Sequence, residues 1–205
     1  AASDVYKRQM LNINKAIDSL VENGWYHQEN VLSREQVLKL SQLCRGRTLT
    51  KASIGNGDKK VINESIRSDN ISWLTDEEKE REILGYQRFA DDFSKKLNEG
   101  LYLGLSEFEC HFAQYPKGSF YKAHKDSFKN DDRRTITLIT YLNENWQEGD
   151  GGELRLHLKD NVVDIKPYGG SIICFRSSEI LHEVLMSNTE RLSLTGWFLK
   201  RNFNN

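Results

Sequence analysis

Apolar residues recur at helical spacing in the first half of the chain. Their spacing predicts a helix over residues 11–20, and Gly24 is placed to end it. The short mixed stretch 25–32 has strand character. Ser33, with Gln36 three residues later, forms a capping-box pattern. This pattern predicts the start of a second helix, and a run of regularly spaced leucines supplies its apolar face.

A third helix is predicted after residue 75. Thr75 and Glu78 repeat the capping-box spacing, and the apolar positions after them form one stripe as far as Leu97. Between the second and third helices, residues 46–73 follow neither a helical nor a strand period. Polar segments of this length in compact domains are usually functional, so we expect a long functional loop there.

Strand-like segments dominate the second half of the chain. The predicted strands are residues 107–115, 134–142, 152–158, 162–165, 170–175 and 191–199. Turn residues separate them and no helical pattern lies between them, which disfavours a parallel α/β sheet. The sequence therefore predicts an α+β protein, with a β-sandwich or jelly-roll core buttressed by the N-terminal helices.

Composition excludes several classes of protein. The 205 residues carry 29 Lys and Arg against 30 Asp and Glu, a formal net charge of −1, so bulk positive charge does not attract nucleic acid. No apolar run approaches the ~20 residues that cross a bilayer. Aromatic residues make up 10%, more than a disordered chain carries. We expect one domain over residues 10–205, with helical support over 10–100 and the jelly-roll core over 101–200.

The cysteines and the N-terminus suggest where the protein works. Cys44, Cys110 and Cys174 are far apart, odd in number and set in apolar surroundings. They predict reduced, buried thiols in a cytoplasmic protein rather than a disulfide framework. Residues 1–9 lack an initiator Met and resemble a translated adapter, so we interpret them as a non-native leader and Met10 as the native start.

The triplet His124-Lys125-Asp126 is the first candidate for chemistry. On a strand, His124 and Asp126 would point to the same side, so that an imidazole and a carboxylate converge. His182 is the natural third ligand of a two-His-one-carboxylate site, which leaves coordination positions open and suits Fe(II). Taken alone, the triplet most often marks a solvated surface.

Two predicted strands carry polar residues at alternate positions. In the last strand, Arg191, Thr195 and Trp197 share one face, and apolar residues occupy the other. Either that polar face lies in water or it lines the barrel, where Arg191 can bind a carboxylate through two hydrogen bonds. Tyr141, on the second of the predicted strands, can donate its hydroxyl to the same carboxylate.

The ordered set of motifs resembles the Fe(II)/2-oxoglutarate-dependent dioxygenases. After the triplet come His182 and, nine residues later, Arg191. Within these enzymes the chain is similar to the prolyl hydroxylase-domain group, which includes animal oxygen sensors and bacterial relatives acting on elongation factor Tu. The matching pieces are IGNG at 54–57, IRSDNISWL at 66–74, QYPKGSFYKAHKD at 114–126, RTITLITYLN at 134–143, the Gly-Gly pair at 151–152 and HEV at 182–184.

The resemblance implies a double-stranded β-helix and a metal centre within it. His124, Asp126 and His182 would bind Fe(II). The cosubstrates would be 2-oxoglutarate and O2, and ascorbate is a further candidate.

The resemblance also implies a pocket for 2-oxoglutarate. Arg191 would pair with the distal carboxylate, and Tyr141 would hydrogen-bond to it. Tyr115 matches a second tyrosine of this pocket, Thr195 faces inward beside Arg191, and Trp197 would pack near the metal.

A third set of residues is implied for the substrate. Arg67 and Asp69 match a loop that closes over the substrate, with a surface ion pair as the alternative. Arg134 matches a substrate-side arginine, with a solvated rim charge as the alternative. His111 shares a strand face with Tyr115 and is expected in the pocket wall or the core rather than as a metal ligand.

The implied function is hydroxylation of a prolyl residue in a protein substrate, of the peptidyl-proline 4-dioxygenase type, with release of succinate and CO2. A translation factor is one candidate substrate, oxygen sensing is one candidate role, and we expect no membrane or nucleic-acid partner. Three alternatives stay open: the same chemistry on another side chain, free amino acid or small metabolite; a non-catalytic binding module; and a cupin-type protein.

Overall fold

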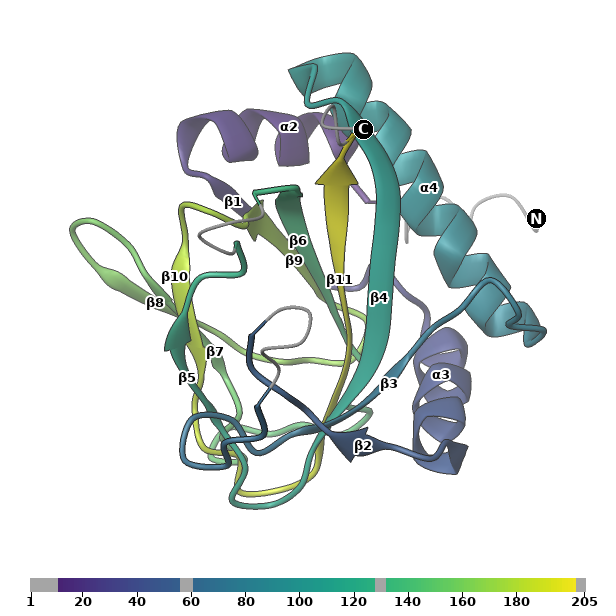
Figure 1. Cartoon of the computed structure of the whole chain (residues 1–205), viewed down its shortest axis with the longest axis vertical. Coiled ribbons are helices and arrows are strands. Elements are labelled where there is room, and N and C mark those ends of the chain that lie inside the picture. Colours follow the sequence, from purple (N-terminus) through teal and green to yellow (C-terminus); the bar gives the residue numbers. More distant parts are fainter. Residues whose placement is uncertain (1–10, 56–60, 128–131, 202–205) are drawn as a thin grey trace.

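The computed structural model describes residues 11–55, 61–127 and 132–201 of the chain. The predicted leader, residues 1–9, and Met10 lie outside these ranges. Within them the chain forms three helices and eleven strands, and the strands make two antiparallel sheets (Figure 1). None of the described helices is both long enough and apolar enough to cross a membrane.

The larger sheet has the strand order β1-β9-β6-β11-β4-β3-β2. Its strands are β1 (Trp25–Gln28), β2 (Thr50–Lys51), β3 (Asn70–Trp73), β4 (Leu105–Tyr115), β6 (Arg134–Tyr141), β9 (Ile172–Arg176) and β11 (Arg191–Lys200). The long strand β11 pairs with β6 on one side and with β4 on the other, so its residues lie at the centre of this sheet.

The smaller sheet has the strand order β5-β10-β7-β8 and lies on the left in Figure 1. Its strands are β5 (Tyr121–His124), β7 (Leu154–His157), β8 (Val162–Ile165) and β10 (Leu181–Val184). An apolar cluster fills the space between the sheets, with Ile139 and Phe175 from the larger sheet and Leu154 and Val184 from the smaller. This architecture confirms the predicted α+β jelly-roll core.

The helices α2 (Ile13–Glu22), α3 (Arg34–Gly46) and α4 (Arg81–Leu101) cover the larger sheet. Helix α2 contacts β1, and α3 and α4 contact β4. Ser33 caps α3 through the predicted capping box, in which its hydroxyl accepts from the Gln36 N–H and the Gln36 side chain accepts from the Ser33 N–H. The prediction that N-terminal helices pack on one sheet is confirmed.

The third helix starts later than predicted. It begins at Arg81, whereas Thr75 and Glu78 close a turn in which the Thr75 hydroxyl accepts from the Glu77 N–H. Two hydrogen bonds of 2.7 and 2.8 Å from Arg47 hold the Glu78 carboxylate against the end of α3. A local capping pattern suits a turn and a helix equally, and this contact across 31 residues selects the turn.

The predicted long loop over residues 46–73 is also partly wrong, because it contains β2 and β3. In β3 only Ile71 is buried, so the sequence shows no apolar alternation that would indicate a strand. Pairing with β4 makes it a strand. The six strands predicted further along the chain all occur within two residues of their expected bounds.

Candidate active site

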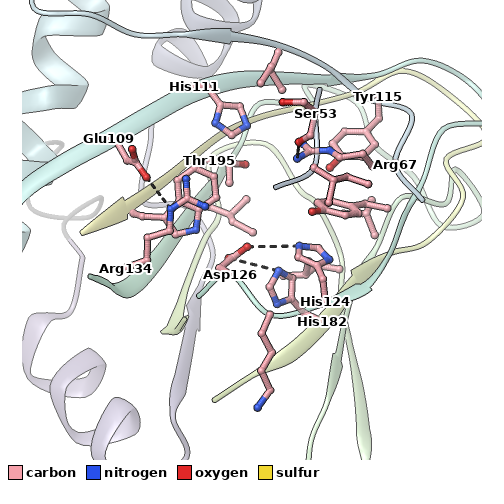
Figure 2. Close-up of a pocket in the computed structure, with 18 of the residues that line it drawn as sticks. Ser53, Arg67, Glu109, His111, Tyr115, His124, Asp126, Arg134, His182 and Thr195 are labelled. Carbon is pink, nitrogen blue, oxygen red and sulfur yellow. Dashed lines mark hydrogen bonds and ion pairs between the residues drawn. The ribbon is translucent and has the colours of Figure 1, made fainter. Parts of the chain in front are cut away.

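A pocket of about 400 Å³ opens between the two sheets, and residues from both sheets and from the segment before β3 line it (Figure 2). Candidate residues from all three predicted sets line this pocket, whereas Tyr141 and Asp69 lie behind its lining. His124, Asp126 and His182 occupy one wall, and Arg191, Tyr115 and Thr195 also line the pocket. Trp197, Arg134 and Arg67 line it as well. Arg67 and Trp197, which lie 130 positions apart in sequence, are therefore brought together in one cavity.

The three predicted metal ligands form one cluster. His124 ends β5 and lies directly opposite His182 on β10 in the antiparallel register. Figure 2 shows the Asp126 carboxylate facing both imidazoles, 3.5 Å from Nε2 of His124 and 3.6 Å from Nε2 of His182. Asp126 lies two residues beyond the end of β5, so the expectation that one strand carries both residues of the triplet is wrong.

Hydrogen bonds fix which imidazole nitrogens face the cluster. Nδ1 of His124 lies 2.7 Å from the Lys122 carbonyl, and Nδ1 of His182 lies 3.1 Å from the Ile180 carbonyl. A carbonyl only accepts, so each Nδ1 carries a proton, and in a neutral imidazole Nε2 then presents a lone pair toward the cluster. Two lone pairs and a carboxylate that converge without a proton between them fit a divalent cation.

Burial and neighbouring groups set the protonation states of His182 and Asp126. Burial lowers the pKa of His182 to about 4, so this imidazole is neutral at physiological pH. Burial acts to raise the pKa of Asp126. The neighbouring His182 and His124 and a hydrogen bond from Thr137 lower this pKa by more than burial raises it, so the carboxylate stays ionised. The cluster therefore has the charge and the deprotonated donors that Fe(II) requires.

Arg191 provides a second, positively charged subsite. Its side chain is 2% exposed, and it donates only to oxygens that carry no net charge, the Gly152 carbonyl at 2.8 Å and the Ser193 hydroxyl at 3.4 Å. Within the described residues, no carboxylate lies at ion-pair distance from it. A Cβ at Gly152 would lie 2.9 Å from Cδ of Arg191, so glycine is needed there for this close approach.

The two predicted tyrosines flank this guanidinium. Its central carbon lies 4.8 Å from the ring centre of Tyr115 and 5.2 Å from that of Tyr141. The Tyr141 hydroxyl is buried and has no hydrogen-bond partner among the described residues. Because burial raises the pKa of Tyr141 to about 12, this hydroxyl keeps its proton and can donate it in a hydrogen bond. A buried cation beside an unused donor fits the carboxylate of a small dicarboxylic acid.

The polar face of β11 lines the barrel rather than lying in water. Thr195 and Trp197 border the pocket, whereas Leu194 and Phe198 pack under the helices on the other side of the sheet. The alternation seen in the sequence therefore separates a pocket face from a core face, as the interpretation with an inward-facing Arg191 requires.

Arg67 and Asp69 form a buried ion pair. Nε and Nη2 of Arg67 lie 2.8 and 2.6 Å from the two carboxylate oxygens, and the Asp69 side chain is fully buried. The alternative of a surface ion pair is therefore wrong. Arg67 itself lines the pocket, and its guanidinium lies 4.3 Å from the ring centre of Tyr121.

Arg134 is also held in place rather than solvated. Its Nε donates to Glu109 over 2.7 Å (Figure 2). Its guanidinium lies 3.7 Å from a ring centre of Trp197. Its side chain is 16% exposed, which rules out the alternative of a solvated rim charge. Arg134 and Trp197 both line the pocket.

Sequence reasoning missed Tyr121, whose ring stacks on that of His124 with centres 3.6 Å apart. Residues three apart on a regular strand face opposite ways, but a bulge in the pairing of β10 with β5 turns both rings into the pocket. The hydrogen bond from Thr137 to Asp126 was also missed. His111 lies in the pocket wall, as expected, between Trp73 and Trp197.

Comparison with known proteins agrees with this geometry. The model of the 2OG-Fe(II) oxygenase superfamily matches residues 110–199, which contain the cluster and Arg191. Mouse prolyl hydroxylase EGLN3 is 29% identical over 196 residues, covering 89% of this chain and 81% of the mouse protein.

Two solved structures are similar over nearly the whole chain. A prolyl-4-hydroxylase from Pseudomonas putida is 40% identical with a TM-score of 0.84, covering 93% of this chain and 100% of that one. A prolyl hydroxylase from Trichoplax adhaerens, solved with a peptide fragment of the oxygen degradation domain of hypoxia inducible factor, is 26% identical with a TM-score of 0.83. The alignment covers 98% of this chain and 94% of the Trichoplax chain. The chain therefore belongs to the 2OG-Fe(II) oxygenase superfamily and is prolyl hydroxylase-like within it.

Proposed function

We propose that the protein hydroxylates a prolyl residue of a protein substrate, with Fe(II) and 2-oxoglutarate. In the balanced reaction one oxygen atom of O2 enters the substrate C–H bond and the other enters succinate, and CO2 is released. The observation that carries the proposal is the convergence of the His124-Asp126-His182 cluster and the unpaired Arg191 in one pocket. The prolyl hydroxylases among its relatives support the substrate class.

The residues of the chain divide the work between two ends of the pocket. His124, Asp126 and His182 would hold Fe(II), which supplies the redox chemistry when bound. Arg191 would bind the far carboxylate of 2-oxoglutarate, and the Tyr141 hydroxyl would donate to it. Because both groups are buried, water does not compete for these contacts.

A further part of the pocket lining suits the substrate. Arg134 is fixed by Glu109 and stacked on Trp197, so its positive charge is held in place at the pocket. Trp73 is 40% exposed at the same pocket and offers an aromatic ring there. An exposed aromatic surface beside a fixed charge suits a peptide that carries proline.

The experiment that tests this proposal is mass spectrometry of a host proteome incubated with the purified protein, Fe(II), 2-oxoglutarate and O2. We expect some prolyl peptides to gain the mass of one oxygen atom, and none to gain it with His182→Ala. Succinate formation that depends on a small metabolite, with no modified proline, would instead assign the protein to the small-molecule hydroxylases.

The finer parts of the proposal concern setting and substrate. The described thiols, all three of them free and buried, support a reducing cytoplasm. The resemblance to enzymes that act on elongation factor Tu supports a translation factor as substrate, and the resemblance to animal oxygen sensors supports a sensing role. Rates measured against O2 concentration, with and without ascorbate, test the sensing role and the need for that reductant.

A further inference from the structure

Asp126 is the one residue of the cluster that no strand holds. His124 and His182 lie on paired strands of the smaller sheet, whereas Asp126 follows the end of β5. Within the described residues, its backbone N–H donates one hydrogen bond, to the Ser177 carbonyl at 3.2 Å. The position of its carboxylate must therefore come from side-chain contacts.

Two buried hydroxyls supply those contacts. Thr137 Oγ1 lies 2.8 Å from Oδ2 of Asp126, and Ser177 Oγ lies 2.9 Å from Thr137 Oγ1. Both residues are fully buried. An ionised carboxylate only accepts, so Thr137 must donate its single proton to Asp126, and the Ser177 hydroxyl must donate to Thr137. The hydrogen bonds thus run in one direction, from Ser177 through Thr137 to Asp126.

This chain of hydrogen bonds connects the two sheets. Thr137 lies on β6 of the larger sheet, and the Ser177 N–H donates to the Thr135 carbonyl of the same strand. The two histidines belong to the smaller sheet. The hydroxyls therefore anchor the carboxylate to one sheet while it faces imidazoles carried by the other.

Packing alone does not explain a hydroxyl at residue 137. Valine has nearly the same shape and suits a buried strand, and a buried hydroxyl is unfavourable unless it forms hydrogen bonds. The hydrogen bond to Asp126 therefore explains why residue 137 carries a hydroxyl.

We propose that Thr137 and Ser177 are positioning residues that orient the Asp126 carboxylate toward the metal. The inference rests on the proposed metal site and goes beyond it by assigning a role to two residues that touch neither substrate nor cosubstrate. Partners of this kind that hold a metal ligand typically contribute about 10- to 100-fold to metal affinity.

The test measures the affinity of the metal-free protein for Mn(II) by titration calorimetry. Thr137→Val, which keeps the shape and removes the donor, should weaken binding by roughly 10- to 100-fold. Thr137→Ser, which keeps the donor, should bind within about threefold of the wild type. Ser177→Ala should weaken binding to a smaller extent, because Thr137 keeps its bond to Asp126 but loses its own donor.

Thr140→Val is the matched control. Thr140 is equally buried on the same strand, and its hydroxyl bonds the Tyr86 hydroxyl at 3.0 Å on the helix side of the sheet. This variant loses one buried hydrogen bond but should bind Mn(II) as the wild type does. Thermal melting of each variant reports whether it is folded.

Three results would overturn the inference. One is unchanged affinity in Thr137→Val, and another is equal weakening in Thr140→Val, which would assign the effect to general loss of stability. If Thr137→Val does not fold, unchanged affinity in Ser177→Ala would count against the inference in the same way. A wild-type protein that binds no Mn(II) would instead overturn the proposed metal site itself, so the two failures are distinguishable.

Discussion

Arg191 is a buried positive charge for which the described residues supply no negative partner. A charge in such a place is unfavourable unless something neutralises it, and the neighbouring Tyr141 hydroxyl is also left without a hydrogen bond. Both features are satisfied together when a ligand carboxylate enters the pocket. The free energy that Arg191 costs in the folded chain is therefore recovered on binding.

Replacing Arg191 should separate the two ligands of the pocket. In Arg191→Ala, loss of a charge-assisted bidentate contact should cost about 2–4 kcal/mol, or roughly 30- to 1000-fold in the apparent affinity for 2-oxoglutarate. Mn(II) affinity should stay near that of the wild type, because Arg191 is not part of the cluster. Arg191→Lys keeps the charge but not the two-pronged hydrogen-bonding geometry, so its affinity for 2-oxoglutarate should lie between those of the wild type and Arg191→Ala. Equal losses for metal and cosubstrate would indicate misfolding.

His111 should make the stability of the protein depend on pH. Burial lowers its pKa from 6.5 to about 3. Between these values the unfolded chain binds a proton that the folded chain does not bind, so the free energy of unfolding falls as the pH falls through this window. Acidification from about pH 7 to about pH 5 should remove about 2 kcal/mol through this residue.

The variant His111→Phe lacks this titration. Urea unfolding at both pH values should show a smaller loss in the variant than in the wild type, and the difference should be about 2 kcal/mol. A constant offset from altered packing cancels in this comparison. Equal losses in the two proteins would show that His111 can take up a proton in the folded state.

At the scale of elements, the segment before β3 reaches the metal cluster through a stack of side chains. Asp69 holds Arg67, Arg67 lies over Tyr121, and Tyr121 stacks on His124. The same Arg67 lies 3.4 Å from the Ser53 carbonyl, so the two ends of the segment meet at the pocket. A peptide that contacts this segment would thus lie close to the metal cluster.

The double variant Arg67→Ala with Asp69→Ala tests the segment as a substrate element. Removing both residues leaves no unpaired charge in the interior, whereas removing only one of them would leave the charge of the other buried and unpaired. Hydroxylation of a protein substrate should fall by roughly tenfold to hundredfold, because the peptide loses its positioning. The slow, substrate-independent turnover of 2-oxoglutarate should change little, because it needs only the cluster and Arg191.

The exposed bidentate pair Arg155 and Asp164 offers a matched control for this experiment. Its double alanine variant should leave both rates unchanged, since the pair lies outside the pocket lining. A parallel fall of the two rates in the Arg67 and Asp69 variant would show that the stack supports the metal site. If neither rate falls, the segment does not act on a peptide, and a small-molecule hydroxylase becomes the better assignment.

At the scale of the whole molecule, the metal cluster joins the two sheets. Its histidines come from the smaller sheet, and the larger sheet anchors its carboxylate through Thr137. A cation that binds all three residues therefore stabilises the packing of one sheet on the other. Binding to the native state alone should raise the free energy of unfolding in proportion to the logarithm of the metal concentration.

Thermal melting should show this stabilisation. Mn(II) at about one hundred times its dissociation constant should add about 2.7 kcal/mol, and a chelator should remove the gain. His124→Ala and His182→Ala should melt at the same temperature with and without Mn(II). A wild-type melting temperature that does not respond to Mn(II) would contradict the assignment of the cluster.

The sequence alone determined the parts that depend on local pattern. Alternation on the last strand separated Arg191, Thr195 and Trp197 from the apolar positions, because the side-chain period of a strand is fixed by its backbone. Helical spacing located α2, and the capping box at Ser33 located the start of α3, because the helix period and the cap both depend on residues only three or four positions apart. The order and spacing of the metal ligands and Arg191 were enough to indicate the family.

Only the tertiary structure decided the parts that depend on contacts between distant residues. A hydrogen-bonded pair with Arg47 turned the capping pattern at Thr75 into a turn, and pairing with β4 made a strand of Asn70–Trp73. A bulge brought Tyr121 onto His124, and two buried hydroxyls fixed Asp126 beyond the end of its strand. The pairing of β5 with β10 and the contacts from Arg47, β4 and Ser177 come from segments far apart along the chain, so no local spacing carries a signal for them.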